Sequence, residues 1–282
     1  MIPLIARRFL RTAHRPSVGL PHEGFCRISP TAYGDEVNQD PVPSSPSRED
    51  LDALRPVAAL IAERIGGSGT AVVGMAGGVA VGKSTTAASL RSVLDLQLAH
   101  SCSIVSSDGF LLPNDTLAEQ GIFHRKGFPE SYDRAAIEGF VLAIRRQQFP
   151  ITVPLYDHLL HDVLEASATI ESTDVVLFEG VNTLGFASSL DLSIYIDAAE
   201  SSMRRWYLDR VLELRRRSVE EPSAFFATFA QLSQDEFLQR AEMIWETVNL
   251  PNLLEHIEPT RDCADIVIRK GPDHAIESVL VR

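Results

Sequence analysis

The sequence is poor in cysteine, with only Cys26, Cys102 and Cys263 in 282 residues. None of them stands in a Cys-x-x-Cys pair, so the pattern predicts neither a disulfide framework nor a four-ligand zinc site. Long apolar runs are also lacking, because Arg, Asp or Glu breaks each one before the roughly 18 residues that a membrane span requires. We therefore expect a protein of a reducing compartment, the cytoplasm, that does not cross a membrane.

Basic residues are outnumbered, and lysine is rare among them. The chain has 26 Lys plus Arg against 38 Asp plus Glu, a formal net charge of −12. Binding of nucleic acid through its phosphates needs a basic surplus, so we expect no nucleic-acid partner and favour small-molecule chemistry. The three lysines are Lys83, Lys126 and Lys270, and two of them lie in motifs.

The first 46 residues differ in composition from the rest. Residues 1–22 carry four arginines and no acidic residue, and six prolines follow between residues 16 and 47. This composition predicts a disordered leader. An arginine-rich start without acids fits a mitochondrial transit peptide, which would change the location, but it equally fits a mis-assigned start codon or a basic tail. We predict that the folded domain covers residues 47–282.

Short apolar segments alternate with helical ones after Ser47, where a first helix is predicted to begin. Apolar strands separated by helices are typical of an α/β fold with a doubly wound, mainly parallel sheet. The predicted strands are Ala71–Met75, Ser103–Ser107, Asp174–Phe178, Leu192–Ile196, Asp265–Arg269 and Ile276–Val281. The further predicted helices are Ser84–Leu96, Arg134–Arg146, Glu200–Arg217, Pro222–Leu232 and Ser233–Asn249.

A phosphate-binding motif follows the first predicted strand. Residues 77–84 fit the pattern G-x-x-x-x-G-K-[ST], and Thr85 follows; in this pattern backbone N–H groups and a helix N-terminus bind nucleotide phosphates. Lys83 would reach the β- and γ-phosphates, and Ser84 would offer its hydroxyl to Mg²⁺. We therefore expect ATP and Mg²⁺ as cofactors. The predicted nucleotide-binding residues of the loop are Gly77, Gly78, Val79, Ala80, Val81, Gly82, Lys83, Ser84 and Thr85.

Two acidic residues at predicted strand ends indicate a kinase. A GTPase would need an Asn-Lys-x-Asp box, and none of the three lysines lies in one. Asp108 follows the second strand, where a base for an incoming hydroxyl would lie; the alternative is a turn former or helix cap. Glu179 ends the next buried strand and is suited to hold Mg²⁺ through water; the alternative is a carboxylate at the sheet edge.

Further segments are distinctive in combination. They are Ser107–Leu111 (Ser-Asp-Gly-Phe-Leu), Lys126–Asp133 (Lys-Gly-Phe-Pro-Glu-Ser-Tyr-Asp), Pro154–His158, Glu179–Asn182, Trp206–Arg210 and Pro259–Arg261. Together with the phosphate loop they closely resemble the bacterial type I pantothenate kinases, from about residue 70 to the C-terminus. The segment Lys126–Asp133 is the most specific, because the related uridine kinases and phosphoribulokinases share the loop but lack it. The resemblance implies a P-loop kinase domain with helical substrate and lid elements in its C-terminal part.

The resemblance also implies an activity. The family phosphorylates the terminal hydroxyl of pantothenate with Mg-ATP, the first step towards coenzyme A, and is usually a homodimer inhibited by coenzyme A. Lys83 becomes the phosphate clamp, Asp108 the base on the acceptor, and His274 a residue near the adenine. Arg210 is also suited to steady the transferred charge, because a guanidinium is permanently cationic. The implied substrate-binding residues are Asp108, Tyr156, His158, Tyr207, Arg210, Phe226 and Asn252.

The sequence departs from the family where phenylalanines line the pantothenate pocket. Those positions read Val211, Leu214, Val219 and Phe226, so we expect a wider or differently shaped pocket. Ala88 stands where better-known members have an arginine that meets coenzyme A, which predicts weakened end-product inhibition. Two alternatives stay open: a kinase of another hydroxylated metabolite, such as a nucleoside or sugar, and a nucleotide-binding regulator without transfer activity.

Overall fold

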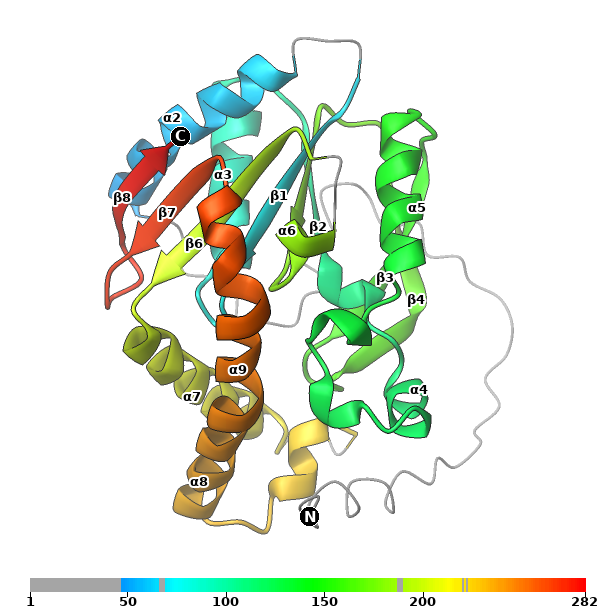
Figure 1. Cartoon of the computed structure of the whole chain (residues 1–282), viewed down its shortest axis with the longest axis vertical. Coiled ribbons are helices and arrows are strands. Elements are labelled where there is room, and N and C mark those ends of the chain that lie inside the picture. Colours follow the sequence, from blue (N-terminus) through cyan, green and yellow to red (C-terminus); the bar gives the residue numbers. More distant parts are fainter. Residues whose placement is uncertain (1–46, 66–68, 187–189, 220, 222) are drawn as a thin grey trace.

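A six-stranded sheet runs through the centre of the protein (Figure 1). The computed structural model describes residues 47–65, 69–186, 190–219, 221 and 223–282, so the predicted leader lies outside the described residues. The strands are β1 (Ala71–Gly77), β2 (Cys102–Ser106), β5 (Val175–Glu179), β6 (Leu192–Ala198), β7 (Ile266–Lys270) and β8 (Ile276–Val281).

The order of the strands is β2-β5-β1-β6-β7-β8. All neighbouring pairs are parallel except β7 and β8, which are antiparallel. Every residue of β1 and β5 is buried. Burial on both faces explains why these strands are continuous apolar runs without a polar alternation. The predicted mainly parallel sheet is confirmed.

Helices cover both faces of this sheet (Figure 1). α2 (Arg48–Arg64) and α3 (Lys83–Gln97) share a buried cluster with Val73 of β1. α5 (Arg134–Arg145) shares another with Val72, whose side chain points to the opposite face. α2 begins where the sequence predicted, because Ser47 Oγ accepts a hydrogen bond from the N–H of Asp50 at 3.0 Å. Across the part of the chain that the structure describes, no helix has the length and apolar character needed to span a bilayer.

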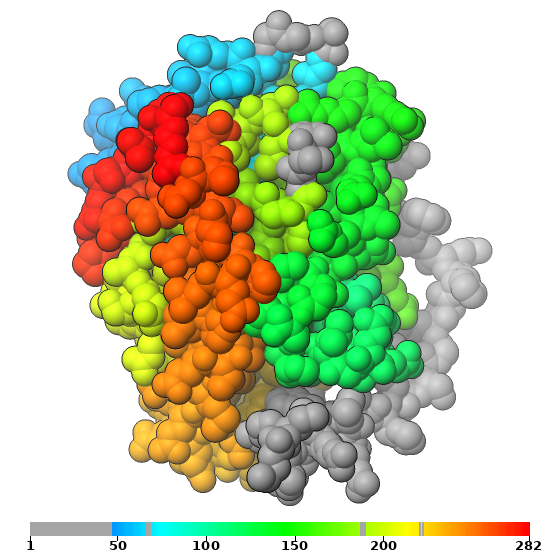
Figure 2. Space-filling model, viewed as in Figure 1, coloured from blue at the N-terminus to red at the C-terminus, as the bar shows by residue number. Residues whose placement is uncertain are grey.

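The C-terminal helices form a separate layer. α7 (Glu200–Arg217) matches its predicted bounds, and α8 (Gln234–Ile244) continues beyond the predicted end, through α9 (Leu250–Asn252), to Ile257. The predicted end at Asn249 was wrong because π-helical turns on both sides of α9 accommodate Pro251, which lacks an N–H donor. In Figure 2 this layer, in orange, lies against the green segment near residue 125.

The helix predicted over Pro222–Leu232 was also wrong. Pro222 lies outside the described residues, and Phe225–Phe229 forms a short 3-10 helix. Its phenylalanine rings pack on one another and on Phe237 of α8, with the Phe226 and Phe237 ring centroids 6.0 Å apart. Aromatic packing against one neighbour, and not an amphipathic helical face, therefore determines the structure of this segment.

A second, two-stranded sheet was not predicted from the sequence. β3 (Ile151–Asp157) pairs antiparallel with β4 (Asp162–Ile170). β3 contains Pro154, and a proline in a sequence argues against a strand because it cannot donate a backbone hydrogen bond. The residues of β3 nevertheless alternate between more buried and less buried positions. The pair packs beside α5 and against the turn after β2, with α4 (Asn114–Glu119) nearby (Figure 1). This hairpin brings Tyr156 towards the carboxyl ends of the parallel strands.

Candidate active site

The phosphate loop joins β1 to α3 in the middle of the sheet. β1 lies between β5 and β6, and its carboxyl end opens into the loop. Gly82 begins α3 with a φ of +84°, and a Cβ there would lie 2.7 Å from Lys270 Nζ. Glycine adopts this left-handed φ without strain, and the lysine end lies close by. The predicted succession of strand, loop and helix is confirmed.

Lys83 is buried at the start of α3. Its Nζ donates hydrogen bonds to the carbonyls of Gly77 at 3.2 Å and Gly78 at 2.9 Å, so the ammonium lies across the loop. Burial lowers the pKa of this ammonium, while the charges of Glu179 and Asp108 oppose the shift. The side chain is therefore fixed between the loop and two carboxylates.

Ser84 and Glu179 bring two side-chain oxygens together. Ser84 Oγ donates to Glu179 Oε1 at 3.0 Å, and Glu179 is 4% exposed at the end of β5. Burial raises the pKa of the Glu179 carboxyl, although the Lys83 charge and the Ser84 hydrogen bond oppose this. A hydroxyl beside a carboxylate suits Mg²⁺, which usually takes one or two protein oxygens and completes its shell with water and phosphate. Within residues 47–65, 69–186, 190–219, 221 and 223–282, no three His, Cys, Asp or Glu side chains cluster as metal ligands.

Asp108 lies in the 3-10 turn Ser107–Phe110, directly after β2. Its N–H donates to Ser106 Oγ at 3.3 Å. Because β2 and β5 are parallel neighbours with Ser106 opposite Glu179, both acids come to one end of the sheet. The charge of Asp108 acts on the pKa values of several surrounding groups. They are Lys83, Lys126, Tyr132, Tyr156 and Glu179.

Tyr156 is the predicted acceptor-side residue that the charge of Asp108 reaches, and His158 lies beside it. The rings of Tyr156 and His158 are 5.0 Å apart between centroids. Burial, reinforced by the Asp108 charge, raises the pKa of the Tyr156 hydroxyl well above its ordinary value, so this group is a hydrogen-bond donor at neutral pH. The positive charge of Arg210 in α7 lowers the pKa values of Lys83 and Tyr156. Arg210 therefore lies close to both groups.

The other predicted substrate residues belong to the C-terminal layer. Asn252 Nδ2 donates to the carbonyl of Gly127 at 2.8 Å. Tyr207 packs on a tryptophan ring of the same layer at 5.7 Å between centroids, and burial raises the pKa of its hydroxyl to about 12. Phe226 packs against Phe237. These contacts place Asn252 at the Lys126–Asp133 segment, and a substrate role for Tyr207 and Phe226 stays a prediction.

The positions that depart from the family are not alike in the structure. Val211 and Leu214 of α7 are each 6% exposed and belong to the core. Val219 is 80% exposed, because α7 ends at Arg217 and the chain turns onto the surface. Val219 therefore does not pack in the interior with Val211 and Leu214, and the width of the acceptor pocket stays a prediction.

His274 lies in the turn between β7 and β8, beside the phosphate loop. Its ring stacks on Trp206 with the centroids 3.7 Å apart, and its Nδ1 is 3.8 Å from the position of a Cβ on Gly82. Lys270 Nζ donates to the Gly82 carbonyl at 3.3 Å, and burial lowers the pKa of Lys270 to about 8. His274 is thus close to the loop, while its contact with adenine stays a prediction.

Lys126 is a site residue for which the sequence suggested no role. Its Nζ donates to Asn114 Oδ1 and to the carbonyl of His161, both at 2.6 Å, and lies 4.9 Å from the centroid of the Tyr156 ring. Burial lowers the pKa of Lys126 to about 8, although nearby carboxylates, including Asp108, oppose the shift. The scarcity of lysine was the available signal, since all three lysines lie by the phosphate loop or Asp108.

These features together define the class of protein. A phosphate loop on the central strand, a hydroxyl and carboxylate suited to Mg²⁺, and a second carboxylate facing the acceptor side are the recurring parts of P-loop kinases. The protein is therefore an enzyme that transfers a phosphoryl group from a nucleotide.

Comparisons with known proteins identify the family. The model of the phosphoribulokinase/uridine kinase family matches residues 72–277. A pantothenate kinase of Streptomyces avermitilis is 41% identical over 226 residues, covering 75% of this chain and 69% of that protein. One of Vibrio cholerae is 38% identical over 225 residues, covering 75% and 72%. The solved D-glycerate 3-kinase of Cryptococcus neoformans shares the fold, with a TM-score of 0.57 and 13% identity over 81% of this chain and 99% of that one. The chain belongs to the phosphoribulokinase/uridine kinase family, among its pantothenate kinases.

Proposed function

We propose that the protein transfers the γ-phosphoryl group of ATP to the terminal hydroxyl of pantothenate, giving 4′-phosphopantothenate and ADP, the first step of coenzyme A biosynthesis. The similarity to pantothenate kinases supports this substrate. The observation that carries the proposal is the position of Asp108, whose charge acts on Lys83 on the phosphate side and on Tyr156 and Lys126 on the other. One carboxylate thus faces both reactants.

The chemistry follows from this arrangement. The acceptor hydroxyl oxygen forms a bond to the γ-phosphorus, the bond from that phosphorus to the oxygen of ADP breaks, and the hydroxyl proton passes to the Asp108 carboxylate. Lys83 and Arg210 offset the negative charge of the transferred group. Ser84 and Glu179 would hold Mg²⁺, which when bound neutralises phosphate charge. Catalysis is therefore mainly positioning and charge neutralisation.

The finer assignments belong to the same proposal. His274 would contact the adenine, and the hydroxyls, amide and carboxylate of pantothenate would be bound by the C-terminal layer and the β3–β4 hairpin. The resemblance also supports a homodimer, and the scarcity of cysteine supports a cytoplasmic location. The residues proposed to bind pantothenate are Asp108, Tyr156, His158, Tyr207, Arg210, Phe226 and Asn252.

Product analysis tests the proposed reaction. The full chain is incubated with Mg-ATP and pantothenate, and the products are separated, identified and quantified by mass spectrometry. We expect one phosphopantothenate for each ADP released. ATP binding without any phosphorylated pantothenate would refute the proposed substrate.

Ala88 predicts weak inhibition by coenzyme A. It lies half-buried on α3, just beyond the phosphate loop, and a methyl group offers neither charge nor hydrogen-bond donor to a phosphate. We expect inhibition only at coenzyme A concentrations far above the micromolar range, and stronger inhibition in the Ala88→Arg variant. The rate is measured while ATP and coenzyme A are varied together. Tight inhibition of the unchanged chain, competitive with ATP, would contradict this expectation.

A further inference from the structure

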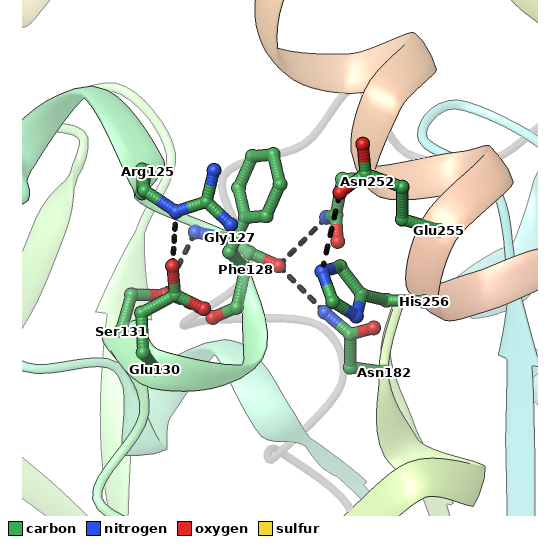
Figure 3. A network of polar contacts seen from close by, with 9 residues as sticks. All are labelled: Arg125, Gly127, Phe128, Glu130, Ser131, Asn182, Asn252, Glu255 and His256. Carbon is green, nitrogen blue, oxygen red and sulfur yellow. Dashed lines mark hydrogen bonds and ion pairs between the residues drawn. The ribbon is translucent and has the colours of Figure 1, made fainter.

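Gly127 is held at both of its polar backbone groups (Figure 3). Its N–H donates to Ser131 Oγ at 2.9 Å. Its carbonyl accepts from Asn182 Nδ2 at 2.6 Å and from Asn252 Nδ2 at 2.8 Å, so both lone pairs of one oxygen are used. The φ of +91° at Gly127 is one that glycine adopts without strain. The backbone at this point is therefore fixed from three directions.

The two amides come from different parts of the fold. Asn182 lies in the loop between β5 and α6 (Thr183–Phe186), shortly after Glu179, and is 2% exposed. Asn252 ends α9 in the C-terminal layer and is 4% exposed. The carbonyl of Gly127 thus joins three elements: the strand that ends in Glu179, the C-terminal layer and the Lys126–Asp133 segment. The phosphoryl transfer described above does not involve Asn182.

The residue before this fixed point is Lys126. Its ammonium is held by Asn114 Oδ1 and the His161 carbonyl. The groups that face it are the Tyr156 ring from β3, the His161 side chain from the following turn, and two carboxylates, Asp162 of β4 and Asp108 after β2. Lys126 and Gly127 are consecutive residues, so this short stretch of backbone joins the partners of the ammonium, Asn114 and the His161 carbonyl, to the two amides that hold the Gly127 carbonyl.

We propose that Asn182 is a positioning residue for phosphoryl transfer, which acts through the Gly127 carbonyl to keep the Lys126 ammonium beside Asp108. Asn252 donates to the Gly127 carbonyl from the C-terminal layer. Asn182 donates to the same oxygen from the loop after β5, the strand that ends in Glu179. The proposal rests on the proposed kinase function, because the position of the Lys126 ammonium affects activity only if Asp108 takes part in phosphoryl transfer. Asn182 itself need not touch either reactant.

The first test is the titration of Lys126 itself, which does not require activity. Protein labelled with ¹³C at the lysine ε-carbons contains only three labelled side chains, and the Lys126→Arg variant identifies the signal of Lys126. We expect a pKa of about 8 in the unchanged protein. In Asn182→Ala the loosened segment lets water reach the ammonium, and the pKa should rise towards its ordinary value. An unchanged Lys126 titration in Asn182→Ala would overturn the proposal.

The second test is kinetic. Asn182→Ala should lower kcat about 10- to 100-fold, the range expected of a small misplacement, while the KM values for ATP and pantothenate change little. We expect kcat of the unchanged protein to fall above about pH 8, where Lys126 loses its proton, and this fall to lie at higher pH in Asn182→Ala. A variant with unchanged kcat and pH profile would contradict the positioning role. Failure of the unchanged chain to phosphorylate pantothenate would instead refute the proposed function, and the lysine titration would still test the contact.

Asn182→Asp keeps the size of the side chain and guards against loss of folding. A protonated carboxyl can donate to the Gly127 carbonyl, whereas an ionised one repels it. The activity relative to the unchanged protein should therefore be highest at low pH and fall as pH rises through the pKa of the buried carboxyl. A ratio that stays constant with pH would count against the proposal.

Thr70→Val is the matched control. Thr70 Oγ1 donates to the Thr173 carbonyl at 2.6 Å, and Thr70 is 4% exposed just before β1, at the end of the sheet away from the phosphate loop. This variant also loses one buried hydrogen bond to a backbone carbonyl. It should be destabilised without any change in kcat or in the Lys126 titration, and the same loss of kcat in Thr70→Val would reduce the Asn182 effect to general destabilisation.

Discussion

The Asp108→Asn variant is expected to lose about 10²–10⁴-fold in kcat, the usual contribution of a positioned general base. The amide has the same shape, so the turn after β2 should persist, but it cannot accept the proton of the acceptor hydroxyl. ATP binding should be nearly unchanged, since the loop and Lys83 are intact. The rate is measured by ADP release, and nucleotide binding by calorimetry.

Asp133→Asn is the matched control for this substitution. Asp133 is exposed and caps α5 by accepting the N–H of Ala136 at 2.9 Å, and Asn caps a helix about as well as Asp. The control should therefore retain full activity. Turnover of Asp108→Asn equal to that of the unchanged protein would remove Asp108 from the mechanism. Loss of ATP binding and turnover together would place Asp108 on the nucleotide side.

The Lys83→Met variant is expected to lose about 10²–10³-fold in kcat, the cost of removing one charged group that stabilises the transition state. The apolar side chain fills similar space but leaves the charge of the phosphates unopposed, so ATP affinity should also fall. This second effect distinguishes Lys83 from Asp108. Both values come from rates and binding measured across ATP concentrations.

Arg91→Met serves as the control for loss of a positive charge on α3. Arg91 lies about two turns beyond Lys83 and is partly exposed, so its removal leaves the loop intact. We expect normal kcat and ATP affinity in this variant. A Lys83→Met protein with normal kcat would contradict the assignment of Lys83 to the transferred phosphate.

The nucleotide half of the site could be predicted from the sequence because it is local. The loop, the lysine and the serine occupy eight consecutive residues from the end of an apolar strand to the start of a helix, so spacing alone fixes their relative positions. Asp108 and Glu179 could be placed only at strand ends. That they face one another depends on β5 lying between β1 and β2, a long-range pairing that no local pattern encodes.

The acceptor half was less predictable for the same reason. Tyr156 reaches Asp108 on a hairpin that Pro154 conceals in the sequence, and Asn252 reaches Gly127 across 125 positions of the chain. The helical predictions failed twice: π-helical turns carry the C-terminal helix past Pro251, and aromatic packing gives a 3-10 helix at Phe225–Phe229 where a longer helix was predicted. Tertiary packing, not local propensity, decides these segments.

The central claim is that the site phosphorylates pantothenate. Its most direct test compares kcat/KM for pantothenate, uridine, ribulose 5-phosphate and simple polyols, with Mg-ATP and ADP release as the readout. We expect a pantothenate value well above all the others, abolished by Asp108→Asn. A higher value for another acceptor would contradict pantothenate as the substrate, and no turnover with any acceptor would favour a nucleotide-binding regulator.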